Sequence, residues 1–215
     1  MSSKTGDRRP ETGDWRPETG VTLLEVTLLL TATAALMAAV APTLSSTIRH
    51  AEIAAATTAM TDISAQANEM LNDLAYQTFT IDGTRTGTGV DLLVSDGDIP
   101  REVSGTGSPS WQPPVDNATG LVDFLERHLV TNDPRGNAAN AYNPAGAPAW
   151  RGAYLTSPID PDPWGNRYAV NTEFLTGGNE DVVVFSAGPD EEIDSLYSGN
   201  GLTAGDDDLF VLVAP

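Results

Sequence analysis

The feature that constrains this chain most is an apolar segment from Val21 to Ile48, which contains a single ionisable side chain, Glu25. At about 1.5 Å of rise per residue, a helix of this segment is longer than the roughly 30 Å hydrocarbon layer of a bilayer. A buried core helix is one alternative, and a secretory signal cleaved near Ala34-Ala35 or Ala38-Ala39 is another. The chain has no second segment of this kind to pack against it, so the sequence favours a membrane-spanning helix.

Glu25 is the unusual residue of this segment, because a carboxylate inside a bilayer costs a few kcal/mol and is retained where it has a partner. Cleavage of the peptide bond after Gly20 would create such a partner. The new amino group of Val21 would carry a positive charge about one helical turn from Glu25, on the same helix or on a neighbouring one. We therefore expect Glu25 to pair with an amine that exists only after cleavage.

Residues 20–26, Gly-Val-Thr-Leu-Leu-Glu-Val, resemble the cleavage signature of type IV prepilins, which pilins share with the pseudopilins of type II secretion. The resemblance implies that a membrane-embedded prepilin peptidase cuts after Gly20 and that Val21 then carries a methylated amine. It also implies that Glu25 helps a subunit to enter a growing filament. Val21 departs from the phenylalanine or methionine usual in the family, and Pro42 falls where many members carry a helix-bending proline.

Residues 1–20 would be the leader that is removed. Its acidic and basic side chains balance, which departs from the basic leaders usual in the family and specifies the membrane topology less firmly.

The whole chain has a net charge of −19, so nucleic acids and anionic lipid surfaces are poor partners for its soluble part. The absence of cysteine excludes disulfides and thiolate metal sites.

The segment 49–78 predicts an amphipathic continuation of the helix. Its apolar residues are spaced three and four apart, at Ile53, Ala56, Met60, Ile63, Ala67, Met70 and Leu74. This spacing indicates that one helical face packs on a domain, with a free-standing coiled coil as the alternative. The helix as a whole is expected to end near Tyr76.

The rest of the chain predicts a small β-domain with long loops. Residues 79–149 are rich in glycine and polar residues and are expected to be loops, apart from residues 90–94, which could pair at a sheet edge, and a short helix over residues 119–130. This helix is expected to be capped by Thr119 and to bury Leu121, Leu125 and Leu129. Residues 150–215 predict an antiparallel sheet, in which residues 168–170 and 181–186 form a hairpin and residues 209–213 add a third strand. The expected fold class is α+β, a long N-terminal helix packed on a C-terminal antiparallel sheet, as in pilins.

Four short motifs in the C-terminal part are similar to the major pseudopilin of type II secretion. They are Trp-x-Gly-x-Tyr-Leu at 150–155, Asp-Pro-Trp-Gly-Asn-x-Tyr at 162–168, Ser-Ala-Gly-Pro-Asp at 186–190 and Asp-Asp-Asp-Leu at 206–209. In the second motif Pro163 presets a turn, Gly165 tolerates a positive φ, and Trp164 offers an apolar plate that can fix the turn to the helix. We expect this turn to determine the fold and to carry no chemistry itself.

The loop over residues 187–208 contains seven carboxylates, in two groups at residues 190–194 and 206–208. Such groups repel one another unless water separates them or a hard cation with several oxygen ligands, such as calcium, neutralises them. The spacing is not that of an EF-hand, and a solvated acidic loop is the alternative. The resemblance implies calcium, held by the Ala187 carbonyl and by the carboxylates. We expect Asp190, Asp207 and Asp208 to be ligands, with Asp194 and Asp206 as competitors.

No grouping of residues indicates an enzyme. Sequence motifs for nucleophilic catalysis, phosphate binding or a transition metal are absent, and His50 and His128 are expected to be surface or interfacial residues. The acidic residues do not form an evident hydrolase pair.

The resemblance implies a structural subunit, a pseudopilin of a type II protein secretion system. Such a subunit would be a single-pass protein of the bacterial inner membrane with its C-terminal domain in the periplasm. Its partners would be the prepilin peptidase, the inner-membrane assembly platform, minor pseudopilins and further copies of itself in a filament. A type IV pilin of a surface fibre for adhesion, motility or DNA uptake is one alternative. A monomeric, membrane-anchored calcium-binding module is the other.

Overall fold

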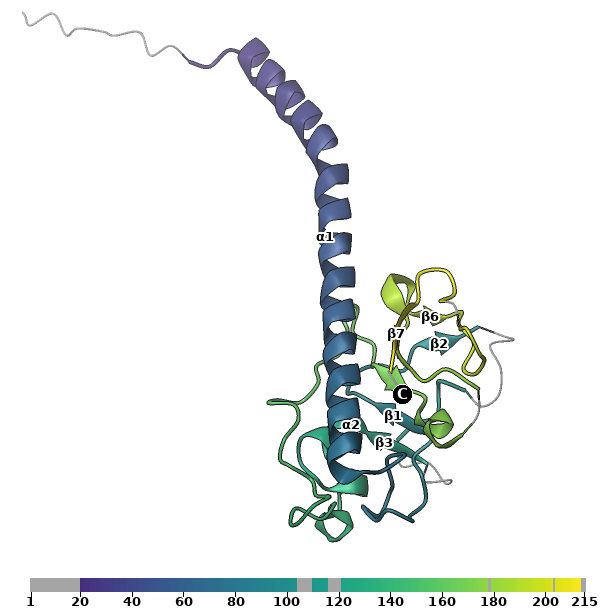
Figure 1. The fold of residues 1–215 in the computed structure, drawn as a ribbon. Coiled ribbons are helices and arrows are strands. Elements are labelled where there is room, and N and C mark those ends of the chain that lie inside the picture. The colour runs from purple at the N-terminus through teal and green to yellow at the C-terminus, as the bar shows by residue number, and fades with distance from the viewer. Residues whose placement is uncertain (1–19, 104–109, 116–120, 178, 203, 214–215) are drawn as a thin grey trace, which may run out of the picture. The chain divides into compact units, whose positions relative to one another are not determined.

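The structure is a computed structural model that describes residues 20–103, 110–115, 121–177, 179–202 and 204–213 (Figure 1). It divides into two compact units, residues 1–47 and residues 48–215. Helix α1 (Leu23–Leu74) begins in the first unit and ends in the second. Helix α1 ends at Leu74, two residues before the expected end near Tyr76. The next residue, Ala75, has a left-handed backbone conformation with φ of 50°.

Helix α1 begins at Leu23 because Thr22 and Glu25 form a capping box. The Glu25 N–H donates to the Thr22 hydroxyl at 3.3 Å, and the Thr22 N–H donates to the Glu25 carboxylate at 2.9 Å. The Thr22 hydroxyl donates to the same carboxylate at 3.1 Å. Two backbone N–H groups that the first helical turn would leave unpaired are therefore satisfied locally.

The described residues of the first unit are mostly apolar, and all are exposed. Most of the hydroxyl groups that interrupt them donate to a backbone carbonyl three or four residues earlier, as Thr27 does to Leu24 at 2.9 Å and Thr33 does to Leu29 at 2.9 Å. This pairing hides polar groups that lipid could not satisfy. By length and composition, α1 is the one helix in the described part of the chain that could cross a membrane, with a mean hydropathy of 2.0 over its most apolar stretch.

In the second unit, α1 buries the face that the sequence predicts. Six of the seven predicted residues are buried, namely Ala56, Met60, Ile63, Ala67, Met70 and Leu74, while Ile53 is half-buried. They pack into one cluster with sheet residues that include Leu93, Val170 and Val184. The helix therefore rests on the domain, and the prediction of an amphipathic packing face is confirmed.

The sheet has five strands in the order β3-β1-β4-β5-β7. Their bounds are β1 Leu92–Val94, β3 Val122–Phe124, β4 Ala169–Val170, β5 Val183–Ser186 and β7 Leu209–Leu212. A separate two-stranded ribbon pairs β2 (Arg101–Glu102) with β6 (Glu192–Ile193). The predicted hairpin and third strand are confirmed, because Ala169 pairs with Phe185 and Phe185 pairs with Phe210 in antiparallel register.

The sheet is mixed, so the prediction of an antiparallel sheet confined to residues 150–215 was too narrow. Strands β1 and β3 pair in parallel, with Leu92 opposite Val122. Strand β1 falls within residues 90–94, which were expected at a sheet edge, but it lies inside the sheet between β3 and β4. Strands β2 and β6 are also parallel. Parallel strands need long connections, and short apolar runs do not reveal the direction of their pairing.

The helix predicted over residues 119–130 is also corrected. Residues 122–124 form strand β3, and only Leu125–Leu129 form a helix, α2, in which Leu125 and Leu129 are buried as expected. Thr119, the expected cap, lies outside the described residues. Pairing with β1 outweighs the local helical pattern here, because it buries Val122 and completes one edge of the sheet.

His128 is fully buried, so the expectation of a surface or interfacial histidine was wrong. Its Nε2 lies 3.0 Å from Asp123 and its Nδ1 lies 2.7 Å from the hydroxyl of Tyr142, which also bonds to the backbone of Thr80. Burial raises the pKa of Asp123, but hydrogen bonds from His128, the Arg135 N–H and Arg127 outweigh burial and lower that pKa to about 2. This buried network ties α2 to the segment that follows α1.

Replacing Asp123 by asparagine is expected to lower the free energy of unfolding at pH 7 by about 3 kcal/mol, because it breaks a buried charge network. The pKa of Asp123 falls from 3.8 to about 2 on folding. The contribution of its charge to the free energy of unfolding is therefore complete above pH 3.8 and is lost as the pH falls through 2. Thermal unfolding of the detergent-solubilised chain should show a difference between wild type and D123N that shrinks over this range. The exposed Asp96 provides the control D96N, and equal stability of D123N and wild type at pH 7 would contradict the argument.

Candidate functional site

The first candidate site is the segment around Gly20, the predicted cleavage residue. Gly20 and Val21 precede the helix, and both are exposed. The peptide bond between them is therefore accessible in the first unit. Glu25 lies in the first turn of α1, where, among the described residues, Thr22 provides the hydrogen bonds of its carboxylate. The spacing Thr-x-x-Glu carries the signal for this capping box, which our sequence reasoning missed.

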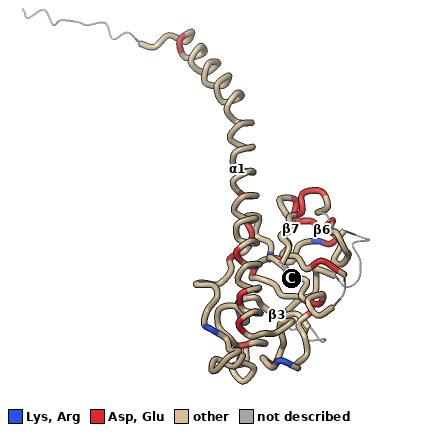
Figure 2. The backbone as a smooth tube through the Cα atoms, viewed as in Figure 1, with Lys and Arg blue, Asp and Glu red and all other residues tan. Residues whose placement is uncertain are grey.

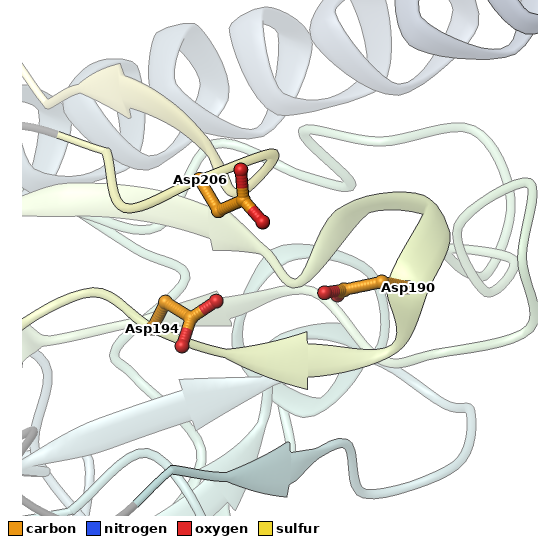
Figure 3. A group of neighbouring side chains, drawn as sticks. All are labelled: Asp190, Asp194 and Asp206. Atoms are coloured by element: carbon orange, nitrogen blue, oxygen red, sulfur yellow. The ribbon is translucent and has the colours of Figure 1, made fainter.

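The second candidate site is the acidic loop, residues 187–208, which connects β5 to β7. Figure 2 shows acidic residues gathered beside β6 and β7. Carboxylate oxygens of Asp190, Asp194 and Asp206 all lie within 4.8 Å of one another, and Figure 3 shows these three side chains pointing toward a common space. All three are exposed. Asp190 ends a short 3-10 helix, Gly188–Asp190, and Asp194 directly follows β6.

The spacing of these three oxygens suits one hard cation. Oxygen ligands 2.3–2.6 Å from a calcium ion lie at most about 5 Å from each other, and the three carboxylates stay within that limit. One oxygen of Asp190 already accepts the Glu192 N–H at 2.9 Å, which orients the carboxylate. An all-oxygen set favours calcium, magnesium or manganese over softer metals.

Asp207 and Asp208 lie beside this triad and are less exposed than its members. Asp208 is 4% exposed, and its Oδ2 accepts the N–H groups of Asp194 at 3.0 Å and Ser195 at 2.7 Å. The Oδ1 atoms of Asp207 and Asp208 are buried, and neither has a hydrogen-bond donor among the described residues. Buried acceptors without donors are rare in proteins. A cation beside the triad, or a water molecule bound to it, would pair these two oxygens.

The electrostatics of the loop also favour a cation. Burial and then the charge of Asp190 raise the pKa of Asp207. Burial raises the pKa of Asp208 to about 6, despite the hydrogen bonds that it accepts, and the charge of Asp194 adds to this shift. Within the described part of the chain, two positive charges reach the loop: Arg101 pairs with Glu192, and Arg49 Nη2 lies 3.8 Å from Asp207 Oδ2. Both arginines are solvent-exposed, so these contacts contribute little. A divalent ion would relieve the repulsion that remains.

The structure thus brings Asp190 together with Asp194 and Asp206, which the sequence favoured less than Asp207 and Asp208 as metal ligands. Asp207 and Asp208, the ligands that the sequence favoured, border the triad, and the buried Oδ1 of each has no donor within the described part of the chain. Ala187 is buried at the entrance of the loop, three residues before Asp190. Our sequence reasoning did not find the contact of Arg49 with Asp207 or the role of the Asp208 carboxylate in holding the backbone at Asp194.

Comparisons of the chain with family models, with curated proteins and with solved structures found no match.

Proposed function

We propose that this chain is a structural filament subunit of the type IV pilin-like class, specifically a pseudopilin of a type II protein secretion system. In this proposal a prepilin peptidase removes residues 1–20, and α1 holds the mature subunit in the inner membrane until assembly. The exposed domain then faces the periplasm. The observation that carries the proposal is an accessible Gly20–Val21 bond directly before an exposed apolar helix with Glu25 in its first turn. No catalytic role is part of the proposal.

The arrangement of Thr22 and Glu25 supports a change of partner during assembly. Before cleavage, Glu25 is satisfied by Thr22, so the carboxylate is tolerable at the start of an apolar helix. After cleavage, the amine of Val21 would lie next to the same carboxylate, on its own helix or on a neighbouring subunit. An ion pair with a neighbour would fix the axial register of two helices in lipid, where few other polar contacts exist.

We also propose that the acidic loop binds calcium through Asp190, Asp194 and Asp206, with Asp207 or Asp208 completing the site. The three converging carboxylates and the buried Oδ1 atoms of Asp207 and Asp208 support this part of the proposal. These observations are independent of the anchor, so they favour equally the second candidate, a monomeric membrane-anchored calcium module. A pilin of a surface fibre would use the same anchor and the same processing.

Substitution of Glu25 tests the filament proposal. In cells that also produce a prepilin peptidase and an assembly platform, chemical cross-linking should give a ladder of oligomers for wild type and only monomer for E25L. The variant E25Q is the sharper test, because glutamine can keep the capping box with Thr22 but removes the charge. We expect E25Q to be cleaved normally and to lose at least nine-tenths of the ladder.

A ladder of wild-type intensity from E25Q would contradict the ion-pair step of the proposal. The control is E52Q, because Glu52 lies on the same helix outside the apolar segment. This control should cross-link as wild type does. If wild type and both variants are all cleaved normally and all remain monomeric, the result would favour the monomeric calcium module.

A further inference from the structure

The turn that contains the Asp-Pro-Trp-Gly sequence is organised around a buried carboxylate. Asp162 is 4% exposed, and its Oδ1 accepts the N–H groups of Trp164 at 3.0 Å and Asn166 at 2.8 Å. The backbone of Asp162 closes the same turn with Gly165 and Asn166 at 2.9 and 2.8 Å. Gly165 has φ of 98°, as expected, and Trp164 packs against the cluster that includes α1. The turn is therefore rigid and anchored to the core.

The second oxygen of Asp162 reaches the acidic loop through Ser186. Ser186 is the last residue of β5 and is fully buried. Its hydroxyl donates to Asp162 Oδ2 at 2.7 Å and accepts the N–H of Gly188 at 3.3 Å. Ser186 also pairs with Leu209, the first residue of β7, so it lies where both ends of the acidic loop meet.

Gly188 links this hydrogen-bond relay to both arms of the loop. Its φ is +71°, and a Cβ at this position would lie 2.3 Å from the carbonyl oxygen of Asp207. The backbone of Gly188 therefore packs directly on that of Asp207, the residue after Asp206. Asp190 lies two residues after Gly188 in the sequence. A shift of Gly188 would change the distance between Asp190 and Asp206, two of the three converging carboxylates.

We infer that Asp162 and Ser186 are positioning residues for the cation site, which they hold in shape without touching the ion. This inference rests on the proposed calcium site. The relay runs from the Asp162 carboxylate through the Ser186 hydroxyl to the Gly188 N–H, and it connects the anchored turn to the start of the loop. Outer residues that orient the ligands of a metal typically change its affinity by 10–100-fold when they are removed.

The test is calcium titration of the detergent-solubilised full chain by calorimetry, with thermal unfolding in chelator as a second readout. We expect S186A to bind calcium about 10–100-fold more weakly than wild type. Its melting temperature in chelator should fall, because the buried Asp162 Oδ2 loses its donor, so the calcium affinity is the readout that separates positioning from stability. The variant S186T retains the hydroxyl and should recover most of the affinity, and the exposed Ser157 gives the control S157A.

Calcium binding by S186A with wild-type affinity would overturn the inference. A variant that loses stability in chelator and keeps its affinity would also overturn it, because the relay would then be only structural. If S186A does not fold, D162N is measured by the same criterion, since asparagine can retain the bonds to Trp164 and Asn166. If the proposed calcium site itself is wrong, wild type will bind no calcium. If only the relay is wrong, wild type and S186A will bind calcium with equal affinity and D190N will not bind it.

Discussion

Saturating calcium is expected to raise the melting temperature of the detergent-solubilised chain by about 5–10 °C relative to chelator. A ligand at 100 times its dissociation constant stabilises the folded state by about 2.7 kcal/mol, and a chain of this size gains about 2–4 °C for each kcal/mol. The physical reason is that Asp190, Asp194 and Asp206 repel one another until a cation enters between them. Magnesium should give a smaller shift, because it demands a stricter octahedral geometry and keeps its water.

The variants D190N and D194N should each lose most of this shift. Each replaces one charged oxygen of the triad by a neutral amide, and both positions are exposed, so the fold should tolerate the change. The control D62N removes an exposed carboxylate from α1 and should retain the full shift. Equal melting temperatures of wild type in calcium and in chelator would contradict the metal site.

Replacing Gly20 by leucine is expected to abolish processing, which is the largest effect that we predict. Gly20 is the residue that the resemblance places immediately before the cleaved bond, and the surroundings of its Cα in the described part of the chain are open. A leucine there would fit the chain itself, so a loss of cleavage would report on the peptidase and not on misfolding. Electrophoresis of cells that produce the peptidase should show the mature size for wild type and the full-length size for G20L.

The control for this experiment is V21M, which supplies one of the residues usual in the family after the cleaved bond. It should be processed as efficiently as wild type. Cleavage of G20L at the wild-type rate would show that the leader is removed elsewhere or by another enzyme.

Much of the fold could be predicted because its signals are local. The apolar segment, the three-and-four spacing of α1 and the hairpin of β4 and β5 all follow from periodicity within short windows. The parallel pairing of Leu92 with Val122 could not be predicted in this way, because it joins segments from different parts of a loop-like region. The burial of His128 was not predicted for the same reason, since its partners Asp123 and Tyr142 come next to it only in the folded domain.

The acidic loop shows where sequence reasoning about a site reaches its limit. Its composition predicts a cation, and Asp190, one of the expected ligands, is among the three converging carboxylates. Three consecutive aspartates, 206 to 208, then compete for the same position. The left-handed backbone of Asp206, with φ of 32°, and the burial of Asp208 decide which of them converges with Asp190. Neither property is visible in the order of residues.

We propose that the chain is a filament subunit that becomes competent for assembly when its leader is removed after Gly20. Mass spectrometry of the intact N-terminus of the protein purified from membranes of its native cells tests this proposal. We expect a chain that begins at Val21 and carries one methyl group on its amine. An N-terminus at Met1, or one created by cleavage at Ala34-Ala35 or Ala38-Ala39, would contradict it.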